Sequence, residues 1–159
     1  MTDDQSSTDT LDLVRDKLSR LGLSGTVKEF PEGTGTAAEA AAAVGCHVDQ
    51  IAKSIVFSVQ GKPLIVVASG GSRIDKKKLS SVIGAKLHSV GRQFIETELN
   101  LVPGGVTPLA VPSGVPVVID RQLASFQSIW ISAGSPTHVV ELSPIELIEK
   151  LGAPVIEIS

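Results

Sequence analysis

Apolar residues recur at two different periods along the chain, and each period predicts a different kind of element. Over residues 11–21 they recur every three or four positions with charged residues between them, which predicts an amphipathic helix that ends at Gly22. Residues 1–10 before this helix are polar and acidic, and this composition is typical of a disordered tail.

The stretch 36–57 combines a helix, a turn and a strand. Thr36 and Glu39 form a capping-box pattern that predicts the start of a helix, and Gly45 supplies the left-handed residue that commonly ends one. From residue 51 onward the pattern alternates, which places Lys53 on one strand face with three large apolar side chains at positions 51, 55 and 57.

Strand patterns dominate the rest of the chain and helical patterns are interspersed irregularly. We expect strands within 26–30, 63–68, 85–90, 115–120, 128–134, 138–142 and 153–159, and helices within 76–83, 91–99 and 144–151. This order predicts an α+β (mixed α/β) fold in which a mixed, curled sheet with packed helices forms a single domain over residues 11–159.

Composition narrows the class of protein. The chain is 42% hydrophobic and 19% charged with a net charge of −3, so a protein that coats nucleic acid through many basic contacts is not expected. The sequence has neither an apolar run near 18 residues nor a signal-peptide pattern, which predicts a cytoplasmic protein with no membrane and no DNA partner.

Cysteine and histidine usage gives few candidates for metal chemistry or for nucleophilic catalysis. Cys46 has no ligand cluster around it, so we expect no metal site and no cofactor. Neither a Ser-His-Asp order nor the HExxH and GxxxxGK motifs occur. A general esterase that uses Cys46 as its nucleophile stays open as an alternative.

Lys53 is the candidate with a physical argument behind it. A lysine among large apolar side chains either extends its ammonium group to water or faces a cleft where it binds an anion. A second candidate is the loop over residues 101–116, because glycines such as Gly104 and Gly105 can direct backbone N–H groups at a carbonyl or an oxyanion. The same loop could also be an ordinary surface turn.

Three segments make the chain resemble a known family. The runs QIAKSIVF (50–57), GGVTP (104–108) and AGSPTHVVELSPIEL (133–147) are similar to the YbaK-type aminoacyl-tRNA deacylases, which are related to the editing domain inserted in bacterial prolyl-tRNA synthetases. The resemblance extends from about residue 11 to residue 158.

The resemblance implies an aminoacyl-tRNA deacylase that hydrolyses an activated ester by positioning it and by using groups of the substrate itself. Lys53 would bind the phosphate or ribose end of the acceptor, and Gly104 and Gly105 would offer backbone contacts near the ester. Implied substrate-binding residues are Phe30, Thr34, Ser54, Pro108, Gly134 and His138. The implied partners are the acceptor end of an aminoacyl-tRNA and, as a candidate, prolyl-tRNA synthetase.

Two positions depart from the family pattern. Many relatives have a glycine a few residues before the Gly104-Gly105 pair, at the position where this chain has Asn100. Val139 stands where the cysteine-removing branch usually carries an acidic residue. We therefore expect tRNA-Pro carrying a small amino acid such as alanine as the first candidate substrate, with cysteine also open. A non-catalytic module of the same fold that binds a nucleotide, a tRNA end or a protein partner is the competing hypothesis.

Overall fold

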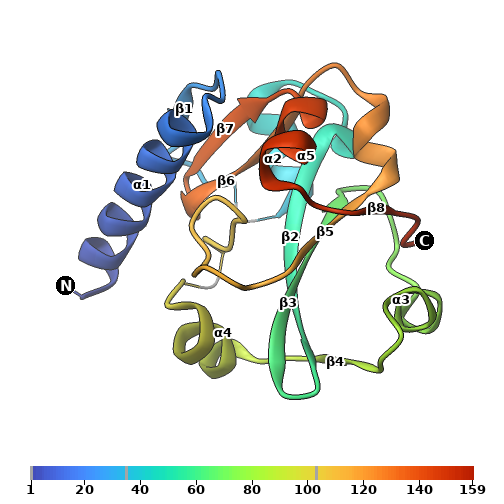
Figure 1. Cartoon of the computed structure of the whole chain (residues 1–159). Helices are drawn as coiled ribbons and strands as arrows, with labels where there is room; N and C mark the ends of the chain where they lie inside the picture. Colours follow the sequence, from blue (N-terminus) through green and yellow to red (C-terminus); the bar gives the residue numbers. More distant parts are fainter. Residues whose placement is uncertain (1, 35, 103) are drawn as a thin grey trace.

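The described part of the chain, residues 2–34, 36–102 and 104–159 with side chains from residue 10 onward, forms one mixed sheet in this computed structural model (Figure 1). The strands run in the order β1-β7-β6-β2-β3-β5-β8, and β4 pairs with β2. Their bounds are β1 Val27–Glu29, β2 Ile51–Val59, β3 Lys62–Ser69, β4 Leu87–Ser89, β5 Val117–Asp120, β6 Ile129–Ser135, β7 His138–Leu142 and β8 Val155–Ile156.

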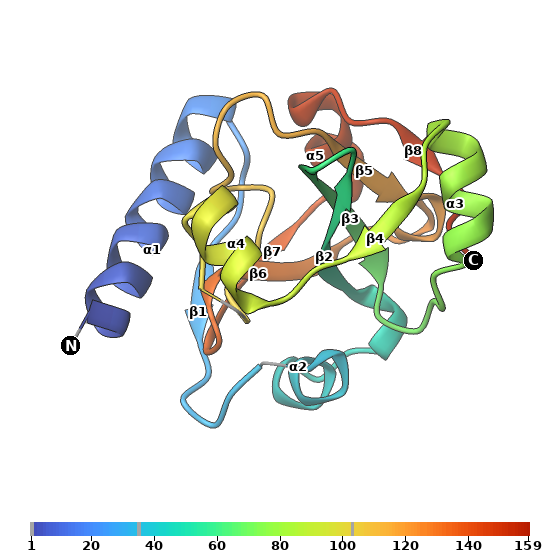
Figure 2. The same ribbon diagram turned by 90° about the horizontal axis from the view of Figure 1, so that it is seen from below.

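Helices cover both faces of this sheet. They are α1 Thr2–Leu21, α2 Ala37–Val44, α3 Lys76–Ile83, α4 Arg92–Leu99 and α5 Pro144–Leu151, with short 3-10 turns at Val48–Gln50 and Arg121–Ser125. Figure 2 shows α2 on one side of the sheet and α5 on the other. This arrangement confirms the predicted mixed fold. None of the helices in the described ranges is both long and apolar enough to cross a bilayer.

Strand β3 lies at the centre of the core. Leu64, Val66 and Ala68 pack into a cluster on one face, while Ile65 and Val67 pack into the largest cluster on the opposite face. All five side chains are buried. An unbroken apolar run is therefore a strand that is covered on both sides, as the sequence predicts.

The predicted helix starts are confirmed by their caps. The backbone N–H of Glu39 donates to Thr36 Oγ1 at 3.1 Å, and the N–H of Glu146 donates to Ser143 Oγ at 3.3 Å. Gly45 closes α2 at a φ of 77°, in the left-handed region. These local signals fix the ends of α2 and α5 without help from distant residues.

Helix α1 is longer than the apolar spacing predicts. The sequence predicts a disordered tail over residues 1–10, whereas the backbone is helical from Thr2. Thr10 is buried and lies against Gly134 of β6, which gives the helix a tertiary contact ahead of its apolar stripe. Met1 and the side chains of residues 2–9 lie outside the described part of the structure.

A bulge in β6 bends the strand next to this contact. The pairing of β6 with β7 shifts register between Ser132 and Ser135, and Gly134 within the bulge has a φ of 102°. A Cβ atom at Gly134 would collide with the side chain of Thr10. Position 134 therefore requires glycine for two independent reasons, its backbone angle and the close approach of α1.

Gly134→Ala is expected to lower the free energy of unfolding by about 2–4 kcal/mol, because the substitution strains the backbone and overpacks the contact with α1. Gly45→Ala is the matched control, since Gly45 is also left-handed but has open space around its Cβ position. The control is expected to lose only about 1–2 kcal/mol. Urea denaturation of both variants measures the difference, and equal losses would contradict the proposed collision.

Candidate functional site

The candidate site lies where two neighbouring strands separate. Strands β2 and β6 pair in parallel at Ile51↔Trp130 and Ala52↔Ile131, the two residue pairs that the described structure gives them. Beyond these pairs β6 enters its bulge, and β4 pairs with β2 only from Phe57 onward. The edge of β2 over residues 53–56 therefore has no strand beside it on this side, and we call this opening in the sheet the fork.

A cavity of about 340 Å³ lies at the fork. Because the sheet is open there, side chains from both of its faces contribute to the wall, together with residues of α2, α4 and the glycine loop. The lining residues are Thr34, Thr36, Ala37, Ala40, Ile51, Ala52, Lys53, Ser54, Ile55, Val56, Val90, Ile95, Gly104, Val106, Trp130, Ser132 and Val139.

Lys53 carries the one charge among these lining residues. Its side chain is partly buried, and no carboxylate in the described ranges lies within ion-pair distance of it. The strand alternation places it on the same face as Ile51 and Ile55, as the sequence predicts. Of the two possibilities left open for Lys53, this geometry favours the lysine that faces a cleft.

Thr34 is held at the cavity by hydrogen bonds between its own turn, which precedes α2, and the turn between β6 and β7. Both its N–H and its Oγ1 donate to the carbonyl of Pro136, at 2.8 and 3.0 Å. Gly104 approaches the same proline, since a Cβ at Gly104 would be 3.4 Å from Pro136 Cγ. Pro136 therefore joins two parts of the cavity wall that are distant in sequence. Phe30 packs beside α2, in the cluster around Ala40, and does not line the cavity.

The three glycines that the resemblance implicates have different positions. Gly104 lines the cavity, with a φ of 84°. Gly105 donates its N–H to the carbonyl of Val102 at 3.0 Å and packs against the backbone of Gly134, where an added Cβ would lie 2.6 Å from the carbonyl oxygen. Gly134 donates its own N–H to Ser132 Oγ at 3.2 Å. Both of these amides are engaged, which leaves Gly104 as the glycine that can offer an N–H to a ligand.

Two further residues implicated by the resemblance lie outside the cavity wall. His138 Nδ1 is 2.6 Å from Ser135 Oγ, and His138 Nε2 is 3.5 Å from a carboxylate oxygen of Glu29 on the neighbouring strand. Its neighbour Val139 lines the cavity in its place, because successive side chains of a strand point to opposite faces. Pro108 is buried in the glycine loop and does not line the cavity either.

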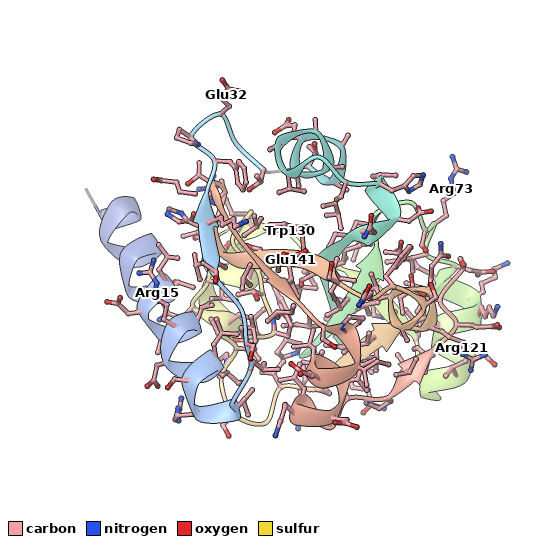
Figure 3. All side chains as sticks on the ribbon, turned by 90° about the horizontal axis from the view of Figure 1, so that it is seen from above. Arg15, Glu32, Arg73, Arg121, Trp130 and Glu141 are labelled. Atoms are coloured by element: carbon pink, nitrogen blue, oxygen red, sulfur yellow. The ribbon has the colours of Figure 1, made fainter. Side chains whose placement is uncertain are left out.

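Sequence patterns do not indicate that residues of β6, α2 and α4 form part of the cavity wall. Trp130 has the alternating context of a core residue, and it is indeed buried, yet part of its ring faces the cavity. Figure 3 shows Trp130 beside Glu141 in the middle of the sheet, while Arg15, Glu32, Arg73 and Arg121 lie at its periphery. The parallel pairing that brings β6 beside β2 joins residues almost 80 positions apart, and no local pattern encodes it.

Cys46 does not line the cavity. Burial, and then the nearby Glu141 carboxylate, raises the pKa of the Cys46 thiol, so the reactive thiolate is disfavoured at neutral pH. Its Sγ donates to the carbonyl of His47 at 3.4 Å. Within the described ranges, no group of three or more His, Cys, Asp or Glu side chains is arranged to hold a metal ion.

Two curated proteins are similar to this chain over most of its length. The YwhH protein of Bacillus subtilis (strain 168) is 30% identical over 141 residues, which cover 88% of this chain and 90% of YwhH. A proline--tRNA ligase of Lactiplantibacillus plantarum is 26% identical over 123 residues, but this chain spans only 22% of the ligase.

A solved structure also has the same fold over almost the whole chain. A crystal structure described as "a putative trans-editing enzyme for prolyl tRNA synthetase" superimposes with a TM-score of 0.86 at 30% identity, covering 94% of this chain and 96% of that one. Residues 31–150 match the family model of the aminoacyl-tRNA editing domain, and these residues include every element that lines the cavity. The chain therefore belongs to the aminoacyl-tRNA editing domain family.

Proposed function

We propose that the protein is a trans-editing hydrolase that deacylates mischarged aminoacyl-tRNA. The observation that carries this proposal is the cavity at the fork, which combines one unpaired lysine with the exposed backbone of Gly104 in a member of an editing family. Because the substrate is a charged tRNA, we also propose that the protein acts in the cytoplasm.

The lining residues support catalysis by positioning rather than by acid-base chemistry. The described residues of the cavity wall include no carboxylate and no imidazole, so a general base would have to come from the substrate, such as a ribose hydroxyl. The Lys53 ammonium attracts a phosphate or the developing oxyanion, and the Gly104 N–H can donate to the same oxyanion. An aminoacyl ester is already activated, so orientation and charge stabilisation are sufficient contributions from the protein.

The walls favour a small amino acid. Ala37 and Ala40 of α2 lie in one apolar cluster with Trp130 and Val139, and these side chains form an apolar part of the cavity wall with no acidic partner among the described lining residues. We therefore propose tRNA-Pro carrying alanine as the principal substrate, with cysteine as the next candidate.

The net charge of the protein bears on whether it selects the tRNA itself or relies on a partner. The chain has a net charge of −3, and the cavity has a single cation, so few phosphate contacts support intrinsic binding of the tRNA body. We propose that a partner such as prolyl-tRNA synthetase helps to present the acceptor end.

Lys53→Ala is expected to reduce the deacylation rate of alanyl-tRNA-Pro by roughly 100- to 1,000-fold, because it removes the one charge that faces the ester. Lys62→Ala is the matched control, since Lys62 is an exposed lysine on β3 outside this cavity, and it is expected to leave the rate unchanged. Thermal unfolding of both variants verifies their fold. If Lys53→Ala retained full turnover, Lys53 would have no catalytic role.

A panel of tRNA-Pro species charged with proline, alanine, cysteine, serine or 2-aminobutyrate tests the substrate. We expect alanine to be removed fastest and proline slowest, since each added methylene must fit against Ala40 and Trp130; one methylene changes the rate roughly 10- to 200-fold. Faster removal of proline would contradict the size argument. No turnover on any charged tRNA would instead favour the non-catalytic binding module.

Cys46→Ala is expected to leave turnover within about twofold of wild type between pH 6 and pH 8. The thiol lies outside the cavity and its raised pKa keeps it protonated in this range, so no thiolate is lost. Alkylation of Cys46, confirmed by mass spectrometry, provides the second arm. Loss of turnover in both arms would establish the competing thiol esterase.

A further inference from the structure

Ser54 carries a buried hydroxyl without a hydrogen-bond partner. Its Oγ is closed to solvent, and it is the one buried side-chain oxygen or nitrogen of the described residues for which no partner is found. An unsatisfied polar group of this kind destabilises a fold, and an alanine at the same position would avoid the loss. Ser54 nevertheless lies in the wall of the cavity, which gives the hydroxyl a possible ligand.

The main-chain N–H and carbonyl groups of Ser54 also point into the fork. The carbonyl of Ile51 accepts from the N–H of Gly70, on the β3 side of β2. Peptide groups of an antiparallel strand alternate between its two neighbours, so those of Ala52 and Ser54 point the opposite way. At Ala52 this side is occupied by β6, whereas at Ser54 it is the open fork. No turn or loop hydrogen bond of the described residues involves the Ser54 backbone.

Lys53 and Ser54 thus divide the cavity into a charged part and a neutral part. Their side chains leave opposite faces of β2, and the fork lets one ligand reach both. Ser54 brings two acceptor oxygens to the cavity, Oγ on one face of β2 and the main-chain carbonyl at the open edge of the strand, beside one donor, its N–H. Because Oγ is closed to solvent, a ligand group reaches it only when the wall of the cavity rearranges, and side-chain rotamer changes of this kind are common when a binding site is filled.

The polar groups of an aminoacyl ester match this division. The ester carbonyl and the phosphate are acceptors or anions, which the Lys53 ammonium attracts, whereas the α-ammonium group is a cation that Lys53 repels. The α-ammonium group only donates hydrogen bonds, and in a cavity without carboxylates it needs neutral oxygens as acceptors. Ser54 offers two such oxygens, Oγ on the face of β2 opposite the lysine and the carbonyl at the open edge of the strand.

We propose that Ser54 is a positioning residue that binds the α-ammonium group of the aminoacyl ester through its carbonyl and hydroxyl oxygens. The site would then select esters of free α-amino acids and reject esters whose nitrogen is acylated or replaced. This inference rests on the proposed function, because it names how the editing substrate is recognised.

Binding of two stable adenosine analogues tests the proposal without turnover. One carries alanine in amide linkage at the 3′ position, and the other carries lactic acid there, which replaces the ammonium group with a hydroxyl. We expect wild type to bind the alanyl analogue roughly tenfold or more tightly in titration calorimetry, and Ser54→Ala to lose most of this preference while its affinity for the lactyl analogue changes less than about threefold.

Two further variants complete the design. Ser54→Thr keeps the hydroxyl and is expected to retain the preference, and Ser58→Ala, on the same face of β2 but outside the cavity, is expected to change neither affinity. Ser54→Ala should also raise the melting temperature, since it removes an unsatisfied group. A variant that is more stable and less selective would distinguish a binding role from a structural one.

The outcomes separate this inference from the proposed hydrolase. Equal weakening of both analogues by Ser54→Ala, or no weakening of either, would overturn the assignment of the α-ammonium group. Hydrolysis of alanyl-tRNA by a wild type without the preference would overturn this inference and keep the proposed function. A preference that depends on Ser54, with no hydrolysis of any charged tRNA, would keep the inference and overturn the hydrolase.

Discussion

The separation of β6 from β2 is the constraint on which the site depends. Two residue pairs hold these strands together, and the bulge at Ser132–Ser135 then turns β6 away. The opening persists because the glycine loop occupies part of it: Gly105 packs directly on the backbone of Gly134, at a distance that no side chain would allow. A continuous sheet at this place would bury Lys53 and Ser54 between paired strands and leave no cavity.

The chemistry that the site can perform follows from its scarcity of charge. One ammonium group stands among hydroxyls, small apolar side chains and backbone amides. Such a wall cannot supply a general base, but it can hold an ester in a fixed orientation and stabilise negative charge on it.

Local signals in the sequence predicted the elements well and the assembly of the site only in part. The caps at Thr36 and Ser143, the alternation around Lys53 and the doubly buried β3 depend on neighbours within a few residues, and the structure confirms them. The roles of the glycines could not be distinguished in this way. Whether an N–H is free depends on distant partners such as Ser132, and the pairing of β2 with β6 leaves no periodic trace in either strand. The helical backbone ahead of residue 11 has no apolar periodicity in the sequence, and Thr10, the first described side chain of α1, lies against Gly134 of β6.

The contact between α1 and the bulge of β6 bears on which residues the folded domain includes. The segment that matches the family model starts at residue 31, after both α1 and β1. Yet Val14 and Leu18 belong to the main core cluster, β1 pairs with β7, and Ile158 near the other end is fully buried. The segment that matches the family model is therefore shorter than the part of the chain that forms the core. If the matched segment were transplanted alone into another chain, the host would have to provide a helix against the bulge and a strand beside β7 to keep the cavity in shape.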